Sequence, residues 1–363
     1  MGNILYLTIP LVLAWVMKGL TRDLRQRYIA VLLTVSFFVF TYLSFFNYDA
    51  VPDVEKYNTI FTLLHTKPIA ELESYDPTYM MEPGYLLYNK TLAFFTDNPR
   101  IIYIVRAFIT LCILGHVLKK HSVNVYISIV VYMLFAGGVM QSIYVIRQYL
   151  AVMIFLLSIE AILEKRLKKY LLICLLGLSF HISVIVLVPV YFIYHYCKFE
   201  KWNKYIVFII FVVISLFSNR LIYYVMNSYG LLVAYADIAS VDEGGGGIGN
   251  AVRYTTFLFL FLSLNKKVWS NGYGKLYLSV LLLAAFFSMG IIGIPSGSRL
   301  MIGFNFFYML IIPFIYVSIK SLPLKRIYAL MIVLLIAFLQ YKDLVNVNYH
   351  QFYYMWENAK NIT

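Results

Sequence analysis

Four arginines and one histidine stand out in this sequence because each interrupts an apolar segment. The histidine is His181, in the stretch GLSFHISVIVLVPVYF, and the arginines are Arg106, Arg147, Arg253 and Arg299. An arginine placed in a membrane costs about 3 kcal/mol or more and usually faces a cavity or the inside of a helix bundle. Its planar fork of donors matches phosphate oxygens. The set indicates a site for a phosphorylated ligand, although any single arginine could instead extend to the lipid headgroups.

The sequence also offers three groups that can accept a proton. A neutral His181 can do so, or it can simply satisfy the backbone where a helix breaks. Asp53 in VPDVEKY and Glu82 in MEPGY flank the first long polar segment, and each is either a general base or a solvated carboxylate. The histidines show no HExxH pattern or paired spacing, so we expect no metal site.

The elements that must position these residues are membrane helices. The chain has 363 residues, of which 62% are hydrophobic and 13% are charged, a far more apolar composition than that of soluble domains. Apolar segments recur from end to end, and no polar block is long enough to fold separately. We therefore expect an all-α, polytopic integral membrane protein that forms a single membrane domain over residues 1–363.

The placement of charge predicts the topology. The net charge of +13 arises mainly from lysines and arginines in short loops. By the positive-inside rule these loops face the cytoplasm, so the excess does not indicate a nucleic-acid partner. Most of the 17 acidic residues then fall on the outer side, where we expect the polar chemistry. The loops lie near residues 18–27, 119–120, 165–169, 198–204, 266–275 and 320–326.

About ten full spans follow from this topology, with both termini outside. Residues 4–17 lack a basic leader and a cleavage site, so we expect a retained helix there. Three further outer segments are expected: a large loop at 47–99, a glycine-rich loop at 218–250 that is a lid or a plain linker, and a C-terminal tail at 341–363. The spans lie near residues 4–17, 28–46, 100–118, 123–140, 143–163, 205–217, 251–264, 276–292, 300–319 and 327–340.

Residues 170–197 lie between two inward loops and are too few for two spans, which need about 40 residues. We expect a re-entrant or short-helix hairpin that turns at residues 179–183. A broken helix leaves backbone groups without partners, which is tolerated in a membrane only where protein or a water-filled cavity satisfies them. The side chains of Ser179, His181 and Ser183 are suited to that task.

Several motifs together resemble the EpsG/Wzy-type bacterial polysaccharide polymerases. The most specific is the block VIRQYLAVMIFLLSIEAILEKRLKKYLLICLLGLSFHISVIVLVPVYF, and DVEKY, EPGY, VRY and GSRL are shorter matches. The resemblance implies a membrane glycosyltransferase of GT-C-like architecture in the bacterial cytoplasmic membrane, with its active site facing the periplasm or cell exterior. Such an enzyme moves a growing glycan from undecaprenyl pyrophosphate to a new lipid-linked repeat unit, without a metal, a nucleotide sugar or another cofactor.

The resemblance assigns Arg147 and His181 to the site, followed by Arg253 and Arg299. On this hypothesis the arginines hold the pyrophosphate, with Arg106 or Arg220 assisting. His181 takes the acceptor proton, or failing it Asp53 or Glu82. Membrane lipids and a chain-length regulator protein are the other expected partners.

Three other functions remain open at this point. A lipid-linked oligosaccharide flippase or transporter would place polar groups near the midplane in related halves, whereas here the broken segment occurs once. A membrane O-acyltransferase would also need an intramembrane histidine, but it would not need four arginines near the outer ends of helices. A glycan ligase differs from a polymerase only in its acceptor.

Overall fold

A computed structural model describes most of the chain, and these parts form helices without any strand, as expected for an all-α protein. The expected spans at 4–17 and 28–46 and the residue Asp53 lie outside the described residues. The described residues are 54–72, 81–135, 145–228, 246–270, 272–292, 294 and 297–346.

Four helical segments are long and apolar enough to cross a membrane, and two bent helix pairs bring the number to six within the described residues. This supports a membrane protein, but the described part does not reach the ten spans that we expected. The straight segments are Arg100–His121, Ile146–Leu163, Gly272–Gly290 and Leu322–Leu339, and the bent pairs are Lys204–Ser215 with Phe217–Tyr224 and Gly297–Asn305 with Tyr308–Ser318.

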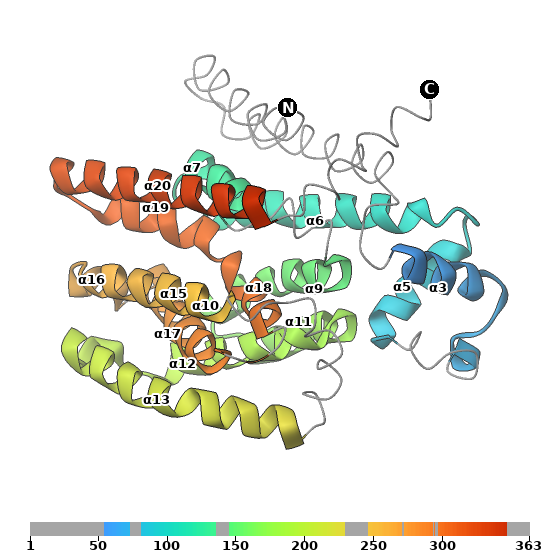
Figure 1. The fold of residues 1–363 in the computed structure, drawn as a ribbon, viewed down its shortest axis with the longest axis horizontal. Coiled ribbons are helices and arrows are strands. Elements are labelled where there is room, and N and C mark those ends of the chain that lie inside the picture. Colours follow the sequence, from blue (N-terminus) through green and yellow to red (C-terminus); the bar gives the residue numbers. More distant parts are fainter. Residues whose placement is uncertain are drawn as a thin grey trace, which may run out of the picture.

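Helices from the first half of the chain lie between second-half helices (Figure 1). They are α6 (Arg100–His121), α7 (Val125–Val130) with the π-helix η4 (Val131–Phe135), α9 (Ile146–Leu156), α10 (Ser158–Leu163) and α11 (Leu167–Phe180). The helices α9 and α11 pack side by side. A tight turn reverses the chain between α10 and α11, with Lys165 at φ 57°. Gly177 then lets α11 approach α9 closely, because a Cβ at this position would lie 3.2 Å from the carbonyl oxygen of Ala151.

The second half of the chain contributes the remaining helices. They are α13 (Lys204–Ser228), α15 (Gly246–Leu262), α16 (Lys266–Trp269), α17 (Gly272–Gly290), η7 (Gly297–Met301), α18 (Ile302–Asn305), α19 (Tyr308–Ser318) and α20 (Leu322–Asn346). The helix α17 packs against both α13 and α15. The helices α13 and α20 expose rows of large apolar side chains, such as Phe217 and Phe338, which suits contact with lipid.

Residues 170–197 contain a helix break followed by short helices. The helix α11 ends at Phe180, His181 is extended with φ −163° and ψ 129°, and two short helices follow. They are η5 (Ile182–Leu187) and α12 (Pro189–Tyr196), and the turn η6 (Phe199–Lys201) comes next. The helix therefore breaks at the histidine, where the sequence placed the turn.

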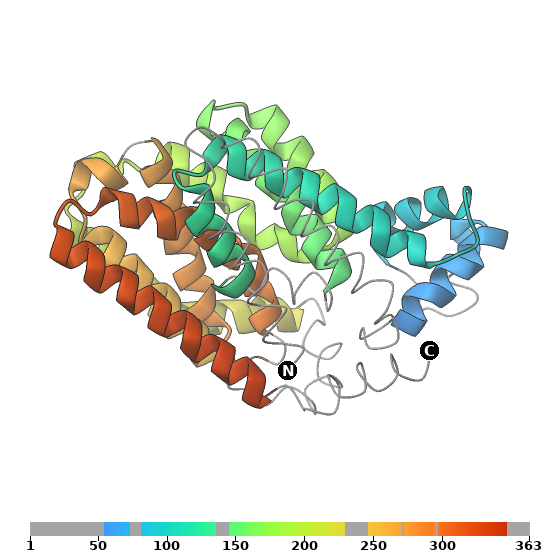
Figure 2. The ribbon, with the colours of Figure 1, turned by 90° about the horizontal axis from the view of Figure 1, so that it is seen from above.

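The segment expected as an outer loop at 47–99 contains helices. These are α3 (Val54–Thr66), η2 (Ile69–Glu71) and α5 (Pro83–Ala93). Figures 1 and 2 show α3 and α5 together at one end of the bundle, beside the start of α6. Three other boundaries also differ from expectation: α13 continues past residue 217, α15 begins within the glycine tract, and α20 continues past residue 340. The bundle and this helical end together position the candidate site.

Candidate functional site

The site begins with Glu82, which stands at the N-cap of α5. Its backbone is extended (φ −57°, ψ 139°), as expected for a residue before proline, and Pro83 occupies the first helical turn. The Glu82 side chain does not cap its own helix. It is therefore free to reach across to other helices.

Gly84 brings this first turn of α5 against the end of α11. A Cβ at this position would lie 2.2 Å from the Oγ atom of Ser179 and 2.8 Å from its backbone oxygen. Because only glycine leaves room for such an approach, the Pro-Gly pair serves packing as well as the turn. Glu82 is thereby placed beside the helix break.

Arg147, in the first turn of α9, is the partner of Glu82. Its Nη1 donates to Oε2 of Glu82 in a part-buried ion pair. The guanidinium also lies 6.0 Å from the ring centroid of Tyr57 and 5.9 Å from that of Tyr85, distances typical of cation–π contacts. Its Nε has no hydrogen-bond partner in the described part of the chain. The Nε atom is buried, but 23% of the side chain is exposed, so part of the guanidinium can still meet a ligand.

These contacts bring together motifs that are far apart in the sequence. Tyr57 belongs to DVEKY, Tyr85 to EPGY, and Arg147 to the block that begins VIRQYL. The two tyrosine rings meet edge to face, with centroids 5.7 Å apart. Three of the pieces on which the resemblance rests therefore meet around one guanidinium.

His181 lies at the break, next to the same carboxylate. Its Nδ1 accepts a hydrogen bond from the backbone N–H of Ser183 at 3.1 Å, which caps η5. The N–H of Ile182 lies 3.3 Å from Oε1 of Glu82 and donates to it. Glu82, Arg147 and the break at His181 are thus joined by direct contacts.

Arg299 approaches the same place from the second half of the chain. The side chain of Gln148 donates to the Arg299 carbonyl oxygen at 2.6 Å, which ties η7 to the start of α9. The Arg299 side chain is exposed, and it acts electrostatically on His181, as Arg147 does. Two of the expected arginines therefore lie within electrostatic range of the histidine.

Arg253 is held in a different cluster. Its Nη2 donates to the Oδ1 atoms of Asn250 at 2.6 Å and Asn305 at 2.7 Å. The guanidinium also lies 5.4 Å from the ring centroid of Tyr254 and 5.5 Å from that of Tyr308. The structure therefore anchors this arginine to α18 and gives it no direct contact with Glu82.

Arg106 is buried behind the site. Only 2% of its surface is exposed, and its Nε and Nη1 have no hydrogen-bond partner in the described part. Tyr85 and Tyr88 lie within electrostatic range, but burial raises the pKa of both phenols, so they stay neutral and provide no counter-charge. Arg106 adds positive potential to the region without facing the pair directly.

Arg220 lies on the exposed surface of α13. Its neighbour Asn219 donates to the carbonyl oxygens of Gly290 and Ile292, at 2.9 Å and 2.8 Å, which fixes α13 to the end of α17. Within the described part of the chain, no hydrogen bond or ion pair joins Arg220 to the site. Asp53, the remaining candidate base, lies outside the described residues.

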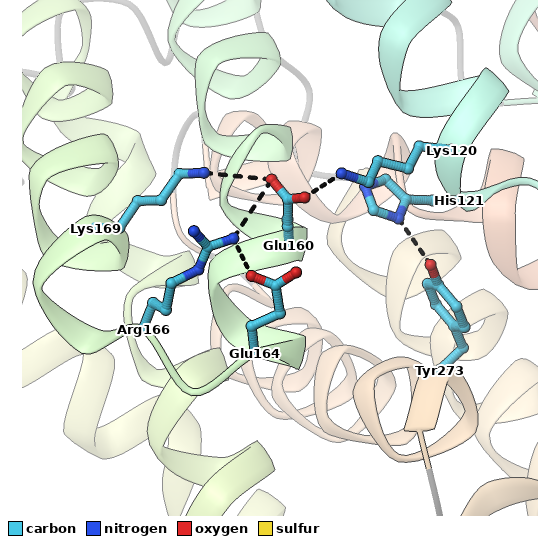
Figure 3. A network of polar contacts seen from close by, with 7 residues as sticks. All are labelled: Lys120, His121, Glu160, Glu164, Arg166, Lys169 and Tyr273. Carbon is cyan, nitrogen blue, oxygen red and sulfur yellow. Dashed lines mark hydrogen bonds and ion pairs between the residues drawn. The ribbon is translucent and has the colours of Figure 1, made fainter.

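A second polar network surrounds Glu160 in α10, close to the start of α11 (Figure 3). Glu160 forms ion pairs with Lys120, Arg166 and Lys169, which come from segments expected on the inner side. Arg166 also pairs with Glu164. These residues therefore gather at one end of the segment formed by α9 and α10, and Glu82, Arg147 and His181 gather at the other.

Sequence reasoning missed three residues of the site. Tyr57 and Tyr85 are two of 33 tyrosines, and Gln148 is a polar residue next to Arg147. The available signal was their position inside the matching motifs, since each follows or flanks a residue already singled out. Their packing role becomes visible only when α3, α5 and α9 are brought together.

The arrangement suits recognition of a phosphorylated ligand. Two guanidiniums can stabilise negative charge on phosphate oxygens. A carboxylate with 19% of its side chain exposed lies beside them and can accept a proton. A histidine completes the group at a helix break, where the backbone turns within an apolar segment.

Apolar helices that can cross a membrane, with this polar cluster at one end, define a membrane-embedded helical protein. The chain matches the model of the EpsG family over residues 30–355, and it belongs to that family, which is of the EpsG/Wzy polysaccharide-polymerase type. No curated protein and no solved structure matches it.

Proposed function

We propose that the protein polymerises polyprenol-linked glycan repeat units. It transfers the growing chain from undecaprenyl pyrophosphate to the terminal sugar of a new lipid-linked repeat unit, at the outer face of the bacterial cytoplasmic membrane. Membership of the EpsG family supports the polymerase class. The observation that carries the proposal is the meeting of Tyr57, Tyr85 and Glu82 around Arg147, beside the helix break.

The chemistry needs two things from the protein. Negative charge develops on the departing pyrophosphate, and Arg147 and Arg299 stabilise it. The attacking hydroxyl must lose its proton, and Glu82 or His181 receives it. The donor already carries its leaving group, so the reaction calls for no nucleotide, and the guanidiniums supply the positive charge that a metal would otherwise bring. Arg253, Arg106 and Arg220 contribute potential around the ligand.

The proposal is tested with purified protein in liposomes and a host-matched undecaprenyl-pyrophosphate repeat unit. We expect a ladder of polymer on a gel without added metal or nucleotide. The ladder should disappear with Arg147→Ala and with His181→Ala, while both variants insert normally. Wild-type ladders from both variants would contradict the site.

Two other outcomes would point to the rival functions. Intact repeat unit that only reaches the other leaflet would indicate a flippase. A single transfer to a lipid A core acceptor, without chain growth, would indicate a ligase.

A further inference from the structure

The surroundings of His181 fix which of its ring nitrogens carries hydrogen. The backbone N–H of Ser183 can only donate, and it points at Nδ1 from 3.1 Å. Nδ1 must therefore offer a lone pair, and in a neutral imidazole the hydrogen then resides on Nε2. The Ser183 hydroxyl, 2.9 Å from the same nitrogen, can donate to it as well. Both contacts favour one tautomer.

This tautomer conflicts with a role as general base. A base needs a free lone pair, and the only lone pair in the neutral ring is already used to cap η5. Protonation at Nδ1 would set a positive N–H against the Ser183 amide. The charged groups around the ring oppose each other, because Arg147 from α9 and Arg299 from η7 disfavour a further positive charge while Glu82 from α5 favours it.

Glu82 has the capacity that His181 lacks. Its Oε2 accepts from Arg147 and its Oε1 accepts from Ile182. Each carboxylate oxygen can accept two hydrogen bonds, so lone pairs remain. The side chain is 19% exposed and can be reached by a hydroxyl.

We propose that His181 is a hydrogen-bond donor to the pyrophosphate through Nε2 and that Glu82 accepts the proton of the attacking hydroxyl, an assignment that rests on the proposed function. The hydroxyl oxygen forms a bond to the anomeric carbon, and the bond from that carbon to the phosphate oxygen breaks. Its electron pair leaves with the pyrophosphate, whose charge is shared with the Nε2–H and the guanidiniums. The hydroxyl proton passes to the Glu82 carboxylate.

Two substitutions separate hydrogen-bond donation to the pyrophosphate from capping of η5. In His181→Asn, the side-chain oxygen can still accept from the Ser183 amide, since asparagine is a strong N-cap residue, but no donor reaches the Nε2 position. In His181→Gln, the longer amide carries its NH2 group outward to that position. If His181 acts as a donor, the His181→Gln variant should keep activity within about tenfold of wild type, and the His181→Asn variant should lose more. If His181 were instead the base, both variants would lose about 100- to 10,000-fold in activity.

The first experiment is nitrogen NMR on histidine-labelled protein in detergent, which reads the tautomer without any reaction. The chain has six histidines, so the signal missing from His181→Asn identifies residue 181. Undecaprenyl pyrophosphate is then titrated into wild type and both variants, and the pH dependence of kcat/KM is compared for wild type and Gln.

An Nε2–H tautomer, together with weaker binding of undecaprenyl pyrophosphate by His181→Asn than by His181→Gln, would support the assignment. An Nδ1–H tautomer, equal binding by all three proteins, or an acidic limb of the pH profile that disappears in His181→Gln would overturn it. Polymer formation by Glu82→Gln at the wild-type rate would also overturn it. If wild type binds undecaprenyl pyrophosphate with the expected order of variants but forms no polymer, the proposed function fails while the donor role of His181 stands.

Discussion

Two carboxylates at opposite ends of the same helices form ion pairs of different character. Glu160 pairs with Lys120, Arg166 and Lys169, whose side chains are all more than 40% exposed. Within the described residues Glu82 forms an ion pair with Arg147 alone, whose side chain is 23% exposed and lies near two aromatic rings. Exposed pairs are screened by water and contribute about 0–1 kcal/mol. The comparison indicates that the partly buried pair is the one placed for chemistry.

One continuous stretch of chain connects these two ends. Arg147 lies in the first turn of α9, and Glu160 lies in α10. At about 1.5 Å per helical residue the two are separated by about 20 Å along the helices. Substitutions at one end should therefore leave the other end undisturbed, and the following predictions test that independence.

The largest effect is expected for Arg147→Ala. Removing a donor that stabilises developing negative charge typically lowers the rate about 100- to 1,000-fold. We expect polymer yield to fall by that factor at normal insertion, measured as ladder intensity per amount of protein. The matched control is Arg166→Ala at the other end, which should polymerise like wild type. Equal losses in the two variants would remove the distinction between the ends.

The next effect is expected for Gly84→Ala. The added Cβ collides with Ser179, and overpacking of this kind typically costs about 1–3 kcal/mol. Glu82 should be displaced, with a loss of activity of about 10- to 100-fold. Combining the change with Ser179→Ala should restore part of the activity, because the nearest atom is then gone. Gly249→Ala is the control, since a Cβ there meets nothing within 4 Å; a comparable loss in the control would refute the packing explanation.

A smaller effect is expected for Gln148→Leu. The substitution leaves the Arg299 carbonyl without its partner, which typically costs about 1–3 kcal/mol when the group is buried. Because η7 carries Arg299, binding of undecaprenyl pyrophosphate should weaken by about tenfold, measured by titration. An unchanged affinity would show that the tie between α9 and η7 is not needed for binding.

The smallest effect is expected for Glu160→Gln. Its ion pairs are exposed, so the free energy of unfolding should fall by no more than about 1 kcal/mol per pair, and the loss should shrink further at high salt. Activity and topology should not change, since acidic residues contribute little to orientation. A loss of polymerisation here would mean that the two ends are coupled.

Much of the framework could be predicted from the sequence. The break at His181 followed from chain length, because too few residues lie between two basic loops for two spans. The gathering of Lys120, Arg166 and Lys169 at one end of the helices followed from charge placement. Both inferences depend on segment length and charge along the chain. Neither requires knowing which helix faces pack together.

The parts that could not be predicted depend on contacts across the bundle. The ion pair between Glu82 and Arg147 joins residues that are 65 positions apart. All four membrane arginines look alike in sequence, but the structure places Arg106 among tyrosines and ties Arg253 to Asn305. The bounds of the helices within residues 47–99 could not be assigned either, because their polar composition resembles that of a loop.

His181 has one further consequence for genetics. The same residue ends α11 and starts η5, so its backbone and its ring support two helices at once. A mutational scan will therefore score most substitutions at this position as harmful, whatever the reaction requires. Intolerance at residue 181 is thus poor evidence of catalysis. The informative substitution in such a scan is asparagine, which keeps the cap and should still lose activity if the ring donates to the pyrophosphate.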